Sequence, residues 1–237
     1  MGKNFYIFVR RISDIALALL GIIVFTPILV PVMIALKLTG EGHIFYLQER
    51  IGYKKKKFHI IKFATMLKNS PNMAGGIITS SGDPRFTPLG PFLRSSKINE
   101  IPQLFNILLG EMTLIGPRPV MEQSFEKYSP NIKEIIYNHV PGLTGIGSII
   151  FSHEEELITK VKESGGDAWD FYVNEIYPYK GELEQWYQRN ISLGTDFKIL
   201  LLTAYSVVSR DKRIVYKVFK TLPARKFILD SGKYQIA

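Results

Sequence analysis

Seven charged or amide side chains in the middle of the chain could together act on a phosphate group. They are Asp83, Arg85, Arg94, Asn99, Glu100, Glu111 and Arg118. Arginines bind phosphate oxygens in pairs, while a carboxylate holds Mg²⁺ together with substrate phosphates, so this mixture suits a site for phosphate and a divalent cation. Surface ion pairs among the same residues are the alternative, and such pairs stabilise a fold only weakly. The residue types leave both interpretations open.

Two local patterns would hold these side chains in place. Arg118 stands between prolines in "GPRP", which suits a charge fixed in advance for a transition state. Asn99 and Glu100 stand at the start of residues 98–108, where apolar residues recur with helical spacing and Pro102 falls near the beginning. Because free amides at a helix N-terminus favour anions, Glu100 is either a functional carboxylate or a helix cap.

The sequence lacks the signatures of several common enzyme classes. No Walker, GxSxG or HExxH pattern occurs and the four histidines are scattered, which argues against P-loop, lipase and metalloprotease functions. The absence of cysteine excludes disulfides and cysteine-rich zinc sites and fits a reducing compartment. The net charge of +9 lies mostly in the first half, which indicates an anionic partner: phospholipid, phosphorylated substrate or nucleic acid.

Residues 15–36 form an uncharged apolar segment that could enter a membrane. As a straight helix they would rise about 33 Å, enough for a hydrocarbon core of about 30 Å. Pro27 and Pro31 interrupt the segment, Thr26 can bond back to a carbonyl, and basic residues flank both ends. We expect a re-entrant helix that breaks at Thr26-Pro27 and leaves on the side it entered. A kinked spanning helix is the alternative.

The rest of the chain predicts a small sheet followed by helices. Residues 44–51 and 58–66 read as strands joined by the basic turn "GYKKKK", which would lie against anionic headgroups, and residues 69–84 read as a loop. Helices are predicted at residues 154–163, 169–190, 195–208 and 213–222, with "VPGLTGIGS" as a turn-rich link before them. The segment "FKILLLTAYSVV" is short of a span and suits an interfacial helix.

Several motifs in order resemble one family. "RRISD", "ERIGYKKKKFHIIKFATM", "GDPRFTPLGPFLRSSKINEIPQLFN", "LIGPRP", "PGLTGIG" and "NISLGTDFKILLL" are similar to the bacterial sugar transferases, the monotopic phosphoglycosyl transferases. The resemblance implies an α/β fold, mainly α with a small sheet, in which a membrane-embedded re-entrant helix carries a cytoplasmic catalytic domain with interfacial amphipathic helices. We expect the re-entrant helix at residues 1–40, the catalytic core with its phosphate and magnesium site at 41–130, and a helical part at 131–237.

The resemblance also implies an activity. Such an enzyme moves a sugar 1-phosphate from a UDP-sugar to undecaprenyl phosphate, requires Mg²⁺, and works on the cytoplasmic face of the bacterial inner membrane. This is the first membrane step of exopolysaccharide, O-antigen or other glycan synthesis. Anionic membrane lipids are expected partners. Nucleic acid is not an expected partner, because basic and aromatic residues do not interleave in the sequence. A homodimer is left open.

The chain departs from the family at Asn99, where the resemblance implies a nucleophilic aspartate. An amide carries no charge and attacks phosphorus poorly. Asn99 is therefore a natural variant in which Glu100 attacks or helps the lipid phosphate attack, an introduced change that traps substrate, or the mark of a silent homologue that binds lipid phosphate or sugar nucleotide. We favour the first account. Glu111 likewise stands where aspartate is more common.

The predicted roles follow from this resemblance. Asn99 and Glu100 form the catalytic pair, and Glu100 holds Mg²⁺. Phosphate binding is assigned to Arg118, Arg94, Arg85 and Lys62, the last of these toward the lipid phosphate. Asp83 supports the site, and Thr26 and Pro27 shape the membrane helix.

Overall fold

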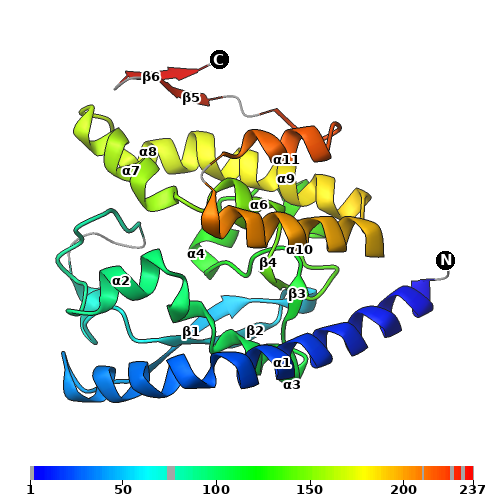
Figure 1. Cartoon of the computed structure of the whole chain (residues 1–237). Helices are drawn as coiled ribbons and strands as arrows, with labels where there is room; N and C mark the ends of the chain where they lie inside the picture. The colour runs from blue at the N-terminus through cyan, green and yellow to red at the C-terminus, as the bar shows by residue number, and fades with distance from the viewer. Residues whose placement is uncertain (1–2, 74–77, 210, 225–226, 231–232, 237) are drawn as a thin grey trace.

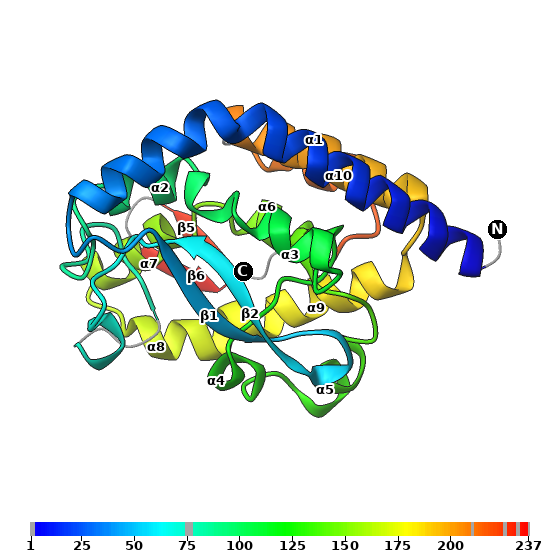
Figure 2. The same cartoon turned by 90° about the horizontal axis from the view of Figure 1, so that it is seen from below.

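A long apolar helix, α1 (Lys3–Leu38), runs along one face of a mainly helical body (Figures 1 and 2). The computed structural model describes residues 3–73, 78–209, 211–224, 227–230 and 233–236. The described part holds three small sheets of two strands each, so the expected mainly helical fold with little sheet is confirmed. The loop expected at 69–84 contains the 3-10 turn η2 (Ser70–Asn72), and its residues 74–77 lie outside the described residues.

Helix α1 is, among the described residues, the one helix long and apolar enough to cross a membrane. It continues without a break through Pro27 and Pro31, unlike the interruption predicted at Thr26-Pro27. Each proline removes one backbone donor, which bends a helix without ending it. The predicted back-bond of Thr26 does form, with Oγ1 donating to the carbonyl of Ile22 over 2.6 Å. The re-entrant course of the chain stays a prediction.

Polar contacts fasten the N-terminal third of α1 to the body. Arg11 donates to the carbonyls of Ile107 and Leu108 over 2.6 and 2.9 Å, and so binds the last carbonyls of helix α3 (Gln103–Leu109). Asp14 accepts the backbone N–H of Leu114 at 3.0 Å and the hydroxyl of Thr113 at 2.5 Å. The charged side chains of Arg11 and Asp14 are thereby satisfied by protein groups rather than by solvent.

Two pairs of strands place the loops of the site. Strands β1 (Phe45–Ile51) and β2 (Lys57–Phe63) form the expected hairpin around η1 (Tyr53–Lys55). Strand β3 (Thr113–Ile115) pairs in parallel with β4 (Gly142–Thr144). The segment predicted as a turn-rich link thus contains a strand and a helix, because the backbone of β3 supplies it with hydrogen-bond partners that local sequence does not reveal.

Helices build the second half, as predicted. They are α4 (Glu122–Phe125), α5 (Pro130–Ile135), α6 (Ile146–Ile150), α7 (Glu154–Glu163), α8 (Ala168–Phe171), the π-helix η4 (Tyr172–Ile176), α9 (Tyr177–Arg189), α10 (Leu193–Val208) and α11 (Arg213–Val218). Helix α2 (Gly90–Ser95) and the 3-10 turn η3 (Ile98–Glu100) precede α3. Strands β5 (Phe227–Asp230) and β6 (Lys233–Ile236) end the described chain.

Separate apolar clusters hold these layers together. The largest joins α6, α7, α9 and α10 around Ile149, Ile158 and Leu183, which are essentially inaccessible to solvent. A second cluster packs Ala18 of α1 against Ile60 of β2 and against Leu104 and Ile107 of α3. The division of the chain at residues 40 and 130 stays a prediction.

Candidate active site

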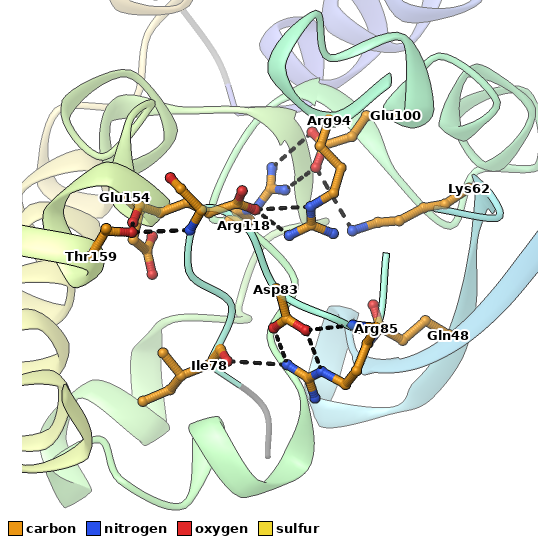
Figure 3. Close-up of polar contacts among 12 residues, drawn as sticks. Gln48, Lys62, Ile78, Asp83, Arg85, Arg94, Glu100, Arg118, Glu154 and Thr159 are labelled. Atoms are coloured by element: carbon orange, nitrogen blue, oxygen red, sulfur yellow. Dashed lines mark hydrogen bonds and ion pairs between the residues drawn. The ribbon is translucent and has the colours of Figure 1, made fainter. Parts of the chain in front are cut away.

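Glu100, Arg118 and Lys62 meet on one wall of a large cavity (Figure 3). Arg118 binds the Glu100 carboxylate with both terminal nitrogens: Nη1 donates to Oε2 over 3.3 Å and Nη2 donates to Oε1. The Lys62 ammonium lies 3.7 Å from the same Oε1. The side chains of Lys62 and Glu100 are 15% and 17% exposed, and that of Arg118 is 38% exposed. Two cations therefore face one carboxylate at the edge of the solvent, and this leaves positive charge for an anion.

The loop that carries Arg118 is fixed by its own backbone. The hydroxyl of Tyr137, a fully buried residue, donates to the carbonyl of Arg118 over 2.9 Å and accepts the N–H of Val120 at 3.0 Å. Gly142 N–H of β4 donates to the carbonyl of Pro117 over 2.9 Å. The rigidity predicted from the flanking prolines thus also depends on Tyr137 and on strand β4. Local sequence does not reveal that these two contact the Arg118 loop.

Glu100 and Asn99 lie in the turn η3, and the α-helix begins only at Gln103, so the helix predicted from residue 98 starts too early. Pro102 has no N–H and cannot continue an α-helical pattern of hydrogen bonds. The turn therefore closes with 3-10 hydrogen bonds, which join residues three apart, such as Glu100 N–H to the carbonyl of Lys97 over 3.0 Å. Lys97 has a left-handed backbone with φ of 60°, a costly conformation that is common at functional sites.

Asn99 is buried, with 5% of its surface exposed. Its amide oxygen has no hydrogen-bond partner within the part of the chain that the structure describes. A buried amide oxygen without a partner is costly, so a bound group that donates a hydrogen bond to it would stabilise this turn. Its neighbour Glu100 presents the charged oxygens of this turn to the cavity.

The charges of the site are set by burial and by one another. Burial works against the ionised form of Glu100, but Arg118 and Lys62 outweigh it and hold the pKa of that carboxyl well below its usual range. Burial lowers the pKa of Lys62 to about 7, although Glu100 acts in the opposite direction. Burial, followed by repulsion from Arg118, lowers the pKa of Arg50 to about 10. A phosphate bound here would stabilise these crowded cations.

The other predicted residues are placed differently. Arg94 lies beside the central group in Figure 3, but its Nε donates to Glu155 of α7 over 2.9 Å. Arg85 and Asp83 form a closed, buried pair, with Nη2 donating to Oδ2 over 2.7 Å and side chains 4% and 6% exposed. Glu111 accepts the amide of Asn106 at 2.8 Å, apart from the Arg118 group. The phosphate roles of Arg94 and Arg85 stay predictions, and each would have to leave a carboxylate to act.

One cavity of about 2350 Å³ is lined by all of these groups except Asp83 and Glu111. A site for one small ligand is commonly about 300–1,000 Å³, so this space suits two substrates at once. Glu154, Lys180, Glu184 and Arg50 also line the cavity, and the sequence did not predict any of them for the site. Their charges are ordinary for strand β1 and for the polar helices α7 and α9, so no local pattern marks them.

The residues of the site can be compared with what a magnesium ion needs. No group of three His, Cys, Asp or Glu side chains gathers among the residues that the structure describes. Mg²⁺ is usually held by one or two carboxylates together with substrate phosphates. Glu100, beside the unpartnered oxygen of Asn99, matches such an open arrangement.

Comparison with known proteins agrees with this geometry. The family model described as "Bacterial sugar transferase" matches residues 5–210. A UDP-N-acetylgalactosamine-undecaprenyl-phosphate N-acetylgalactosaminephosphotransferase of Aeromonas hydrophila is 31% identical over 206 residues, covering 86% of this chain and 44% of that protein. An uncharacterized sugar transferase of Haemophilus influenzae is 33% identical over 216 residues, covering 85% of this chain and 41% of that protein.

A shorter relative shows the same similarity. The exopolysaccharide production protein ExoY of Sinorhizobium fredii is 34% identical over 166 residues, which are 64% of this chain and 73% of that protein. The chain spans less than half of the length of the first two relatives. Because the family model covers most of the chain, including every residue of the candidate site, the chain belongs to the bacterial sugar transferase family.

Proposed function

We propose that the protein transfers a sugar 1-phosphate from a UDP-sugar to undecaprenyl phosphate and releases UMP. The names of relatives support this: one from Aeromonas hydrophila acts with UDP-N-acetylgalactosamine and one from Salmonella typhimurium is an undecaprenyl-phosphate galactose phosphotransferase. The observation that carries the proposal is the meeting of Arg118, Lys62 and Glu100 in a cavity large enough for both substrates.

The geometry favours direct attack by the lipid phosphate. A covalent route through Asn99 lacks a nucleophile, because its amide is neutral and buried. The Glu100 carboxylate is held by Arg118 and Lys62, which lowers its reactivity as a nucleophile. In the direct step, an oxygen of the lipid phosphate bonds to the phosphorus that bears the sugar. The bond from that phosphorus to the bridging oxygen breaks, and UMP leaves with the electron pair and the charge.

Each side chain then has a part in this step. Arg118 and Lys62 bind phosphate oxygens and neutralise charge that develops on them. Glu100 orients both cations and would hold Mg²⁺ against the substrate phosphates, where the ion would neutralise the diphosphate. Asn99 would offer its unpartnered oxygen to the same bound group.

The test is UMP release from a panel of UDP-sugars with Mg²⁺, with and without undecaprenyl phosphate. The protein as given and the Asn99→Asp variant are measured in parallel. We expect release by the unmodified protein only when lipid phosphate is present. Release without lipid would indicate a covalent route, and release only by Asn99→Asp would make the unmodified protein a substrate-binding homologue. Release by neither protein with any donor would contradict the proposal.

We also propose that the protein is monotopic and faces the cytoplasm from the inner membrane. Helix α1 has 36 residues and would be about 54 Å long. Its N-terminal third binds the body through Arg11 and Asp14, while Leu29 and Leu36 near its other end pack with Phe63 and Leu93 of the same body. A helix that crossed a bilayer would carry these two ends to opposite sides, so the packing supports a helix that stays on one side.

The natural absence of cysteine allows a direct test of this placement. Single cysteines at Asn4 and Glu41 are labelled with an impermeant maleimide in spheroplasts and in inverted vesicles. We expect both positions to react only in inverted vesicles. Labelling of the two positions from opposite sides would show a spanning helix.

A further inference from the structure

A second polar cluster lies in the cavity, apart from the phosphate-binding group. Lys180 of α9 donates to Glu154 Oε2 over 2.7 Å and to the hydroxyl of Tyr172 over 3.0 Å. That hydroxyl donates in turn to Glu154 Oε1. The Lys180 ammonium also lies over the rings of Phe151 and Tyr172, 5.0 and 5.1 Å from their centres. The cluster therefore combines a neutralised ion pair, a phenol and two aromatic rings.

The cluster faces the space in front of Arg118. It lines the same cavity as Glu100 and Arg118, and Figure 3 shows Glu154 across from the Arg118 guanidinium. Glu154 is close enough to raise the pKa of Arg118, after the larger effects of Glu100 and burial. The side chains of Lys180 and Glu154 are 18% and 26% exposed, so a bound molecule can reach them.

The chemistry of the cluster suits an uncharged ring with hydroxyl groups better than a phosphate. The charge of Lys180 is matched by Glu154, so no surplus cation remains here, unlike at Lys62 and Arg118. The ammonium, the carboxylate and the phenol supply donors and acceptors at fixed positions, and aromatic rings offer apolar faces. Tyr172 begins the π-helix η4, a local irregularity that frequently occurs at functional sites.

We propose that Glu154, Lys180 and Tyr172 bind the sugar ring of the nucleotide-sugar donor and set which sugar is accepted. The inference rests on the proposed function, since the diphosphate at Arg118 would place the sugar within the same cavity. The class of ligand is a neutral hexose or N-acetylhexosamine. The alternative is an ordinary ion pair that joins α7 to α9 and has no part in recognition.

Equilibrium binding separates these cases without requiring turnover. Affinities for UMP and for the UDP conjugates of glucose, galactose, N-acetylglucosamine and N-acetylgalactosamine are measured by calorimetry with the full protein. Variants are Lys180→Met, Glu154→Gln and Tyr172→Phe. The matched control is Lys133→Met, which breaks a comparable pair, Lys133 to Glu126 at 2.6 Å, outside the cavity. Thermal unfolding of each variant shows that it is folded.

The expected result is a specific loss of sugar discrimination. The unmodified protein should prefer one UDP-sugar over the others by about tenfold or more, and Lys180→Met or Glu154→Gln should reduce that preference to about twofold. The affinity for UMP and the behaviour of Lys133→Met should stay unchanged. A preference that survives in all three folded variants, or no preference in the unmodified protein, would overturn the inference. Absence of binding to any nucleotide would instead contradict the proposed function itself, and the inference with it.

Discussion

At the scale of single residues, Glu184 of α9 is a buried carboxyl group behind Arg118. It is 5% exposed, and a side chain on Gly147 would lie 3.0 Å from its Oε1. Burial raises the pKa of Glu184 to about 8, although the backbone N–H of Arg118 and the ammonium of Lys180 act against this. Glu184 is therefore mostly protonated at neutral pH, which keeps the wall behind Arg118 uncharged.

This raised pKa predicts a pH dependence of stability. Between its ordinary pKa of 4.5 and about 8, the unfolded chain releases the Glu184 proton while the folded protein keeps it. The free energy of unfolding should therefore fall as the pH rises through this window, by about 1.4 kcal/mol for each pH unit at most. Other groups facing Glu184 are Tyr128 and Tyr137, whose pKa values are raised and which stay neutral there.

Urea unfolding of Glu184→Gln at pH 5, 6.5 and 8 checks this prediction. The amide keeps the shape and stays neutral, so the variant should lose most of the fall in stability seen in the unmodified protein. Equal pH dependence in both proteins would show that Glu184 is not the group responsible.

The pairs Arg118–Glu100 and Arg85–Asp83 should respond differently to substitution. Arg118→Lys loses the two-pronged contact with Glu100 and should lower kcat/KM for UMP release by about 10- to 100-fold, with little change in Tm. Arg85→Met leaves the Asp83 carboxylate buried and unpaired, which should cost about 3–5 kcal/mol of stability. Activity assays and chemical unfolding of both variants separate the roles. A stable but inactive Arg85→Met protein would instead support the predicted role of Arg85 in phosphate binding.

Residue types alone predict which side chains belong to the site, but they do not predict which residues those side chains contact. Glu100, Arg118 and Lys62 were predicted, and the structure does bring them together. Arg85 was given the same role as Arg118, yet its guanidinium is turned onto Asp83, two residues away. The direction of a side chain depends on packing around it, which is absent from the local sequence.

At the scale of elements, the close approach of strand β4 to the Arg118 loop requires glycine. A Cβ on Gly142 would lie 2.1 Å from the backbone nitrogen of Gly116 and 2.6 Å from its Cα. Backbone atoms cannot give way as a flexible side chain does. Gly142 and Gly145 of "PGLTGIG" thus allow close contact with Gly116 of the "GPRP" loop, and neither of them has a positive φ.

Gly142→Ala should therefore separate β4 from this loop. We expect a loss of about 3 kcal/mol or more in stability and weaker UMP binding, because Arg118 shifts with its backbone. The control is Gly194→Ala in the first turn of α10, where an added Cβ would lie 3.9 Å from the hydroxyl oxygen of Ser192, an ordinary contact distance. Differential scanning calorimetry and nucleotide titration measure both effects. Equal stability of the two variants would contradict the packing argument.

Elements with strong periodicity were predicted well, and elements defined by long-range pairing were not. Helix α7 occupies the predicted range Glu154–Glu163, and the β1–β2 hairpin forms as expected. The parallel pair β3–β4 was missed because its partners are separated in sequence and each strand has three residues. Local patterns report amphipathic faces, whereas such a pair depends on contacts made only in the folded chain.

At the scale of the whole molecule, α1 and α10 lie along the same edge of the view in Figure 2, and each carries exposed apolar side chains. Their N-terminal ends are joined by the hydroxyl of Tyr6, which donates to Asp196 over 2.6 Å. Ile23 on α1 and Leu201 and Val208 on α10 are 70%, 55% and 85% exposed. Apolar surface of this extent indicates contact with a membrane. The interfacial role predicted for α10 fits this face.

Depth-dependent fluorescence quenching tests whether α10 rests in the bilayer. A bimane label is placed on single cysteines at Val208, at Ile23 as the α1 reference, and at Asn131, which is exposed on α5 at the opposite edge in Figure 2. In vesicles with brominated lipids, we expect quenching at Ile23 and Val208 and none at Asn131, because only the first two face acyl chains. If Val208 stays unquenched while Ile23 responds, α1 alone contacts the bilayer and α10 presents its apolar face elsewhere.

Quenching at Ile23 and Val208 together would orient the cavity relative to the membrane, because the inner side of α10 lines that cavity at Leu200 and Thr203. A lipid phosphate at the bilayer surface would then have a short path to Lys62 and Arg118.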